Sequence, residues 1–397
     1  AIPSPRLARP AGPALAIALL TLTGACSQSS APQAQNSPAQ AKVASAGPVN
    51  SAAPPTIVPP PPANAAPATT AADAALPPAG QAIDQATPSP TSAPAPTSVK
   101  SAAPYDPALV RLEVLLDRAG FSPGVIDGRQ GTNLKRALGA YALAHGQAAD
   151  GAPTPALWSA ITAADAAPAM QSYQITAADE AGPFIGAIPK DYRALAKLSA
   201  LGYTGPEQEL AERFHMSPGL LEALNPGVDF ARPGTTLLVA APRAGPRPYT
   251  VARIEVDKSL GQVRVYQANG AVAAVYPATV GSTERPAPSG QFAVAAVAPH
   301  PAYFYDPARL TFTPQGASGK LRIAPGPNNP VGSTWIALTV PTYGIHGASD
   351  PSEIGKVQSH GCVRLTNWDA AELGAAVKKG VEVDFVGTEK KAGKKKA

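Results

Sequence analysis

The chain has 397 residues, enough for two or three domains, but its composition argues against a folded core in the first hundred. Its 47 prolines are concentrated there, and no Phe, Trp or Tyr occurs before Tyr105, so that stretch has little apolar surface to bury. The net charge of +5 is modest, and the absence of a basic run interleaved with aromatic residues argues against nucleic acid as a partner.

Residues 1–26 have the pattern of an export signal, with two arginines ahead of an apolar run and small residues after it. The run is too short to span a bilayer as a stable helix. Its end, LTGAC at 22–26, resembles the lipobox of bacterial lipoproteins, which implies that Cys26 is lipidated and attaches the protein to a membrane. The alternative is cleavage by an ordinary signal peptidase. Either way the chain is expected to be exported, and we expect it in the periplasm.

Residues 27–104 consist mostly of Ala, Pro, Ser, Thr and Gln, which predicts a disordered, extended linker. Folded structure is therefore expected to begin near Tyr105. At the other end of the chain, residues 388–397 form a lysine-rich tail that we expect to be solvated. The alternative is that this tail rests on anionic lipid or cell-wall polymer.

Residues 105–165 predict three short helices. Leucines from Leu109 to Leu116 recur at helical spacing until Gly120, a second apolar face follows over 134–141, and Trp158 lies in a third. The connection GFSPGVIDG at 120–128 resembles the turn of the three-helix peptidoglycan-binding domain. A helical bundle used only for packing or partner contact is the alternative.

Residues 170–243 predict a second small unit, with helices over 207–214 and from Ser217-Pro218 onward, and a strand over 235–240. The strings LAERFH and LLEALNP, starting at Leu210 and Leu220, resemble the core of a LysM module, which implies glycan binding. The first strand of such a module would be 173–176, separated from the helices by a long insertion. His215 is expected to be a half-buried helix residue.

Residues 247–387 are strand-rich. Alternating polarity predicts a hairpin over 254–257 and 262–266, and the sheet is expected to continue over 272–280. A helix over 368–379, capped by Thr366 and closed by Gly380, precedes a last strand over 381–386. These elements predict a β-rich α+β domain at the end of a multidomain α+β chain.

Cys362 is the cysteine that calls for a chemical explanation. The sequence holds only two cysteines, and if Cys26 is lipidated or removed, Cys362 has no partner for an internal disulfide in an oxidising compartment. A catalytic cysteine needs a base and backbone donors for an oxyanion. His346 lies sixteen residues before it and His360 two before, and the amides of Gly361 and Cys362 are candidate oxyanion donors. A metal site is not expected, because histidines and thiols are too few.

The strings YGIHG at 343–347 and SHGCVRLTNWD at 359–369 closely resemble the catalytic motif of the YkuD-type L,D-transpeptidases. Upstream, PSGQF at 288–292 and NPVG at 329–332 resemble the T-P-x-G-x-F turn and the N-P-x-G segment of the same family. The resemblance implies a mixed β-sandwich with one helix after the catalytic motif.

The resemblance also implies a reaction on peptidoglycan stem peptides without a cofactor. Cys362 would attack the carbonyl of the third residue, a diamino acid, D-Ala would leave, and a thioester would remain. His346 would be the general base and acid, with its ring held by a backbone carbonyl such as that of Gly347. An amine from a neighbouring stem would then form a 3-3 cross-link.

Further roles follow from the same resemblance. His360, Gly361 and Gly347 would orient the site or line the oxyanion hole, while Arg364, Ser359 and Tyr343 would bind substrate. From the residues alone, His360 is equally well a structural histidine, and Arg364 an ion-pair partner. Hydrolysis by an L,D-carboxypeptidase, attachment of a protein lysine to the wall, and a non-catalytic wall-binding scaffold remain alternatives.

Overall fold

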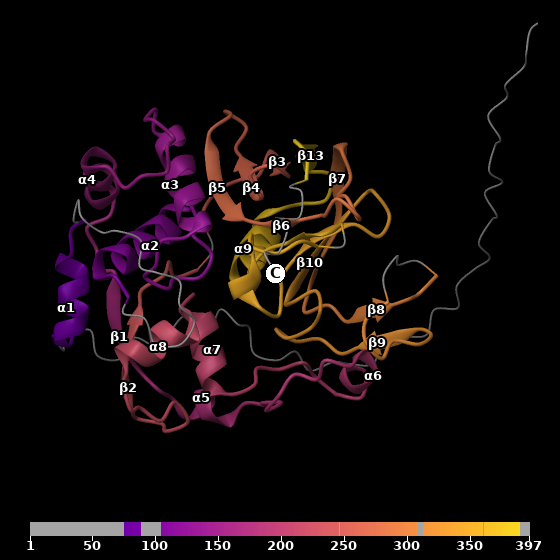
Figure 1. The fold of residues 1–397 in the computed structure, drawn as a ribbon, viewed down its shortest axis with the longest axis horizontal. Coiled ribbons are helices and arrows are strands. Elements are labelled where there is room, and N and C mark those ends of the chain that lie inside the picture. Colours follow the sequence, from indigo (N-terminus) through magenta and orange to yellow (C-terminus); the bar gives the residue numbers. More distant parts are fainter. Residues whose placement is uncertain (1–74, 89–104, 246, 309–312, 360, 390–397) are drawn as a thin grey trace, which may run out of the picture. The chain divides into compact units, whose positions relative to one another are not determined.

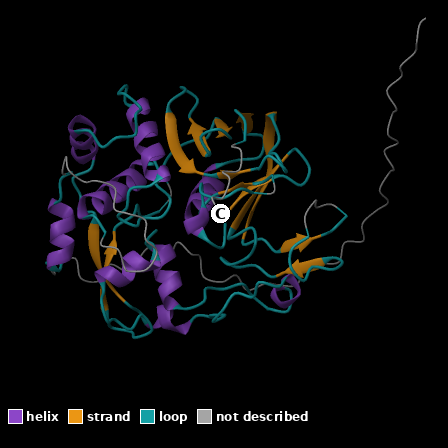
Figure 2. Ribbon diagram, in the orientation of Figure 1, coloured by secondary structure: helices purple, strands orange, loops and turns teal. Residues whose placement is uncertain are grey.

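The computed structural model describes residues 75–88, 105–245, 247–308, 313–359 and 361–389 (Figure 1). The predicted export signal with Cys26 and most of the basic tail lie outside these ranges and stay predictions. Within the described ranges, no helix has the length and apolar character needed to cross a membrane. Helices predominate before residue 230, and strands after residue 250 (Figure 2).

The first described segment is a helix in a region where a disordered linker was predicted. Helix α1 (Pro78–Gln85) buries Ile83 completely, and the Asp84 carboxylate accepts the backbone N–H groups of Ala169, at 2.7 Å, and Met170, at 3.2 Å. The prediction that folded structure starts near Tyr105 is therefore wrong for residues 75–88. Local composition misses this helix because its burial is supplied by apolar residues of later segments, such as Val110 and Leu238.

Replacing Ile83 by Ala should lower the free energy of unfolding by about 2–5 kcal/mol, because it opens a cavity where α1 packs. Urea denaturation followed by circular dichroism measures this loss. The exposed Gln85→Ala variant of the same helix should change stability by no more than about 0.5 kcal/mol. Equal stabilities of the two variants would show that α1 is not part of the folded unit.

The helical unit after α1 has the three predicted helices, α2 (Pro107–Ala119), α3 (Thr132–Ala144) and α4 (Pro155–Ala164). The Asp106 side chain caps α2 by accepting the N–H of Ala108 at 2.8 Å. The helix ends, as predicted, at Gly120, whose φ of +91° is in the left-handed region that favours glycine.

The next unit is a two-stranded antiparallel sheet with helices between its strands. Strand β1 (Met170–Gln174) pairs with β2 (Thr236–Ala240), and the elements between them are α5 (Ala177–Ala181), α6 (Tyr192–Leu195), α7 (Pro206–Arg213) and α8 (Pro218–Leu224). Ser217 caps α8, as predicted, by accepting the N–H of Leu220 at 3.1 Å. Strand β1 begins at Met170, before the predicted 173–176. His215 is not helical as predicted but follows α7 with φ +57°.

The last unit is built on a nine-stranded sheet within the described residues. In spatial order its strands are β5 (Val272–Pro277), β4 (Gln262–Tyr266), β3 (Arg253–Asp257), β13 (Glu382–Val386), β7 (Gly290–Pro299), β10 (Thr334–Leu338), β11 (Gly344–His346), β12 (Val363–Arg364) and β6 (Thr279–Val280). The two edge strands, β5 and β6, are separated only by Ala278, so the sheet nearly closes on itself. A single curled sheet thus replaces the predicted two-sheet sandwich, and the predicted hairpin of β3 and β4 is confirmed.

Helix α9 (Asn367–Ala376) packs against β7, β10 and β11. Thr366 caps it, as predicted, by accepting the N–H of Asp369 at 3.1 Å. The hairpin of β8 (Tyr303–Tyr305) and β9 (Leu321–Ile323) stands outside the main sheet, and a 3-10 turn covers Pro351–Glu353. The helix begins at Asn367, five residues after Cys362.

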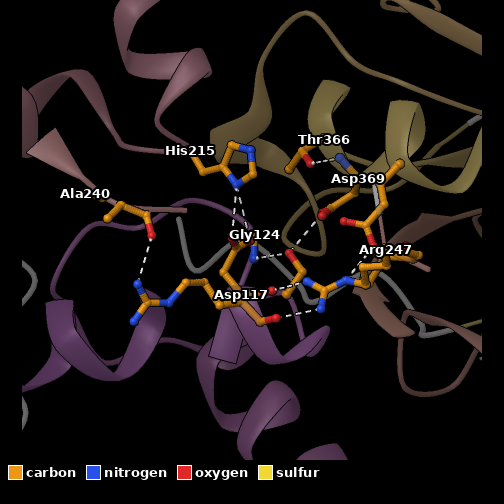
Figure 3. A network of polar contacts seen from close by, with 12 residues as sticks. Asp117, Gly124, His215, Ala240, Arg247, Thr366 and Asp369 are labelled. Atoms are coloured by element: carbon orange, nitrogen blue, oxygen red, sulfur yellow. Dashed lines mark hydrogen bonds and ion pairs between the residues drawn. The ribbon is translucent and has the colours of Figure 1, made fainter. Parts of the chain in front are cut away.

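The helical unit is joined to the catalytic sheet by backbone hydrogen bonds and by a polar network (Figure 3). The Val275 N–H donates to Gly120 O at 2.7 Å, and the Ser122 N–H donates to Val275 O at 2.9 Å. These bonds cover the open edge of β5. Arg247 binds the backbone carbonyl oxygens of Asp117 and Arg118 and also pairs with Glu372.

Candidate active site

Two parallel strands bring the sequence motifs together. Strands β11 and β12 pair so that Ile345 lies opposite Val363 and His346 opposite Arg364. Cys362 directly precedes β12, and the Gly344 N–H, at the start of β11, bonds to its sulfur. The pairing therefore brings the segments that carry the thiol and the imidazole together at two adjacent strands.

His346 is buried and its ring is held in one orientation. Its Nδ1–H donates to Gly347 O at 2.6 Å, which is the hydrogen bond that the resemblance implied, and Nε2 is left as the acceptor. The Trp335 indole stacks on the imidazole, with ring centroids 5.3 Å apart. Burial, and then the Arg364 charge, lower the pKa of His346 to about 3. The ring is therefore a neutral base at neutral pH.

Cys362 is a free thiol that is partly exposed. Its Sγ lies 3.7 Å from Thr342 O. Burial raises the pKa of the thiol, an effect that the Gly344 N–H and Arg364 only partly offset. The raised pKa of the thiol and the lowered pKa of the imidazole both favour the neutral forms over a thiolate–imidazolium pair.

The loop before the thiol is shaped by Ser359. The buried Ser359 hydroxyl donates to Cys362 O at 2.6 Å and accepts the Gly361 N–H at 3.3 Å. Gly361 has φ +110°, and a Cβ there would lie 2.9 Å from the Tyr343 ring, so this position needs glycine. The predicted substrate contacts of Ser359 and Tyr343, and the predicted oxyanion role of Gly361, stay predictions. His360 lies outside the described residues.

Arg364 lines a groove of about 420 Å³ beside the catalytic strands. Lys190 and Tyr192, from the insertion between β1 and α7, line the same groove. In the part of the chain that the structure describes, no carboxylate lies within ion-pair distance of Arg364. The ion-pair interpretation therefore finds no partner there, and an anionic group of a substrate is the role that fits the unpaired charge.

Comparison with known proteins assigns the domain that carries these residues. A family model of the YkuD type, the L,D-transpeptidase catalytic domain, matches residues 251–385. The chain is similar to the YqjB protein of Bacillus subtilis, named as an L,D-transpeptidase, with 30% identity over 34% of this chain and 69% of that protein. The chain belongs to the YkuD family.

Two further similarities each cover part of the chain. The YkuD protein of Bacillus licheniformis is 42% identical over 19% of this chain and 46% of its own length, so the chain spans about half of that relative. An L,D-transpeptidase from Mycobacterium smegmatis aligns at 18% identity over 39% of this chain and 64% of its own, with a TM-score of 0.29. The YkuD match begins at residue 251, so the two small units lie before it.

The sequence did not predict the roles of two residues that contact the candidate catalytic histidine or its neighbour, Trp335 and Asn367. Asn367 was part of the quoted motif, yet its role as a buried amide at the start of α9 was not predicted. Trp335 stacks on His346, although nothing in its own segment signals this contact. The sequence did hold a signal for Asn367. Gly332 and Gly347 both lie in motif segments, and glycines in such segments indicate that another group packs closely against the backbone.

The neutral resting state predicts the pH dependence of alkylation at Cys362. Because the pKa of the thiol is raised, the thiolate fraction is small at pH 7, and the rate of reaction with iodoacetamide should climb through pH 9 without a plateau at lower pH. Peptide mass mapping separates Cys362 from Cys26. A fast, pH-independent rate between pH 5 and 7 would instead reveal a thiolate–imidazolium pair.

Proposed function

We propose that the protein is a peptidoglycan L,D-transpeptidase that forms 3-3 cross-links between stem peptides through a thioester on Cys362. The observation that carries the proposal is the pairing of β11 with β12, which brings His346 beside the segment of Cys362, with the imidazole tied to Gly347 O, inside a YkuD domain. The family membership supports acyl transfer as the reaction class. The arrangement supplies a nucleophile and a base oriented by a third group.

Acylation begins from the neutral pair. Cys362 Sγ attacks the carbonyl carbon of the diamino acid at the third position of a tetrapeptide stem, while Nε2 of His346 takes the thiol proton. Backbone N–H groups near Cys362 stabilise the oxyanion. The imidazolium then gives its proton to the nitrogen of D-Ala, the carbon–nitrogen bond breaks, and the thioester remains.

Deacylation reverses these proton transfers. The amine of a neighbouring stem attacks the thioester carbonyl, His346 accepts the proton of that amine, and the proton returns to sulfur as the thiol leaves. One amide is exchanged for another through the thioester, so no ATP is needed. The low pKa of His346 makes its imidazolium a strong acid, which favours protonation of a poor leaving group.

The remaining parts of the proposal concern location and substrate. The protein is exported, attached to a membrane through lipidated Cys26, and works in the periplasm on cell-wall assembly. The three-helix unit and the LysM-like unit bind peptidoglycan, and Arg364 engages a carboxylate of the stem. The sequence patterns described above and the unpaired Arg364 charge support these assignments.

Purified protein incubated with disaccharide-tetrapeptides should release D-Ala and give 3-3 linked dimers, identified by tandem mass spectrometry. Replacing Cys362 by Ala should lower dimer formation by at least about a thousandfold, because nucleophile removal abolishes the covalent route. Sedimentation with cell-wall sacculi should be unchanged in that variant. The matched Cys26→Ala variant, assayed in the same way, should keep full activity.

Four outcomes would contradict parts of this proposal. Tripeptides without dimers would identify a carboxypeptidase in which water takes the place of the amine. Acyl transfer only to a protein lysine would identify an enzyme that attaches proteins to the wall. Unchanged cross-linking by the Cys362→Ala variant would rule out the thioester, and sedimentation without any turnover would leave a wall-binding scaffold.

A further inference from the structure

Glu212, in α7, is a buried carboxyl that lies outside the YkuD match of 251–385. Its Oε2 accepts a hydrogen bond from Asn367 Nδ2 at 3.0 Å, and its Oε1 accepts one from Gln208 Nε2 at 3.3 Å. No Lys or Arg forms an ion pair with Glu212 in the described ranges. Burial raises the pKa of this carboxyl to about 7. Burying a carboxyl without a cationic partner lowers the stability of the fold, so a contribution to stability does not explain why Glu212 is there.

Asn367 uses its whole amide to join α7 to the catalytic domain. Besides Glu212, its Nδ2 donates to Pro327 O at 3.1 Å, and its Oδ1 accepts the Ser333 N–H at 3.0 Å. A Cβ at Gly347 would lie 2.3 Å from Asn367 Oδ1, so the amide lies directly against the Gly347 backbone. Glu212 therefore supplies one of the three hydrogen bonds that orient this amide, and the one among them that comes from a side chain.

Gly347 transmits this contact to the candidate base. Its carbonyl oxygen accepts the Nδ1–H of His346 at 2.6 Å. A shift of the Gly347 peptide would lengthen or tilt that bond and release the ring from a single tautomer. A continuous path of contacts thus runs from Glu212 through Asn367 and Gly347 to His346.

The two residues that follow Asn367 are also held from upstream. The His215 ring stacks on Trp368, with centroids 4.9 Å apart and ring planes 10° from parallel. The Ser122 hydroxyl donates to Asp369 Oδ2 at 3.1 Å and accepts the Gly124 N–H at 3.0 Å (Figure 3). Three consecutive residues at the start of α9 each contact an upstream unit, so the first turn of this helix is fixed from outside the YkuD domain.

We propose that Glu212 is a positioning residue for His346, supplied to the active site by the unit between residues 170 and 243 through the amide of Asn367. This role rests on the proposed transpeptidase function. It gives the upstream unit a part in catalysis that is separate from any binding of the wall.

The test compares Glu212→Ala with Glu212→Gln in the full chain. The Gln side chain keeps a carbonyl oxygen for Asn367 Nδ2, whereas Ala removes the acceptor. The Ala variant should lower kcat about tenfold with KM within about twofold, because small displacements of a catalytic group cost large factors in rate. The Gln variant should return kcat to within about twofold of the original protein.

Glu113 offers a matched control. It is a buried carboxyl of the helical unit, and it accepts the backbone N–H groups of Asp127 at 3.0 Å and Gly128 at 2.8 Å, all within that unit. Glu113→Gln and Glu113→Ala should lower the melting temperature and leave kcat per folded molecule unchanged. If Glu113→Ala loses kcat as Glu212→Ala does, the effect is general loosening and the proposal is overturned.

A second readout needs no substrate. Nitrogen-15 spectra of histidine-labelled protein, with the His346 signals identified by their loss in His346→Gln, report which ring nitrogen carries the proton. A protonated Nδ1 is expected in the original protein and in Glu212→Gln, and values averaged between tautomers in Glu212→Ala. Unchanged His346 signals in Glu212→Ala would overturn the positioning role. Changed signals in a protein without transpeptidase activity would uphold it and refute the proposed reaction.

Discussion

The hydrogen bond from His346 Nδ1 to Gly347 O is the contact on which the site depends. A buried imidazole N–H without an acceptor would cost about 1–3 kcal/mol, and this bond removes that cost while fixing the tautomer. Only with Nδ1 protonated does Nε2 become a base for the thiol. Burial and the Arg364 charge then keep the imidazole neutral until a substrate is attacked.

The curled sheet explains how this contact is built. Strands β11 and β12 are parallel neighbours, which brings the separate motif segments of His346 and Cys362 side by side. Helix α9 starts shortly after β12 and turns its first residue, Asn367, back onto Gly347. The upstream units attach to this start of α9 and to the edge of β5, so they are built into the architecture of the site.

The sequence predicted what depends on local pattern and on a family motif. The ends of α2 at Gly120 and the caps of α8 and α9 followed from single residues with known preferences. Helix α1 did not, because Ile83 is buried by helix α2 and by distant strands, which leave no trace in its own segment. The curling of the sheet was equally hidden, since it depends on the pairing of β6 with β12, a strand far along the chain.

The site shows the same division. Cys362, His346 and the Gly347 carbonyl were predictable because they lie within contiguous motif strings. Glu212 was not predictable, because its proposed role depends on one hydrogen bond with Asn367, which lies 155 residues away in the sequence. A buried carboxyl looks like any surface glutamate in sequence, and only its tertiary neighbours reveal a role.

The most direct test of the account is the mass of the protein caught during turnover. Acid quenching with a disaccharide-tetrapeptide substrate, followed by peptide mapping, should find the tripeptide acyl group attached to Cys362, with D-Ala released. Product accumulation with Cys362 unmodified under these conditions, or an acyl group on any other residue, would contradict the thioester mechanism.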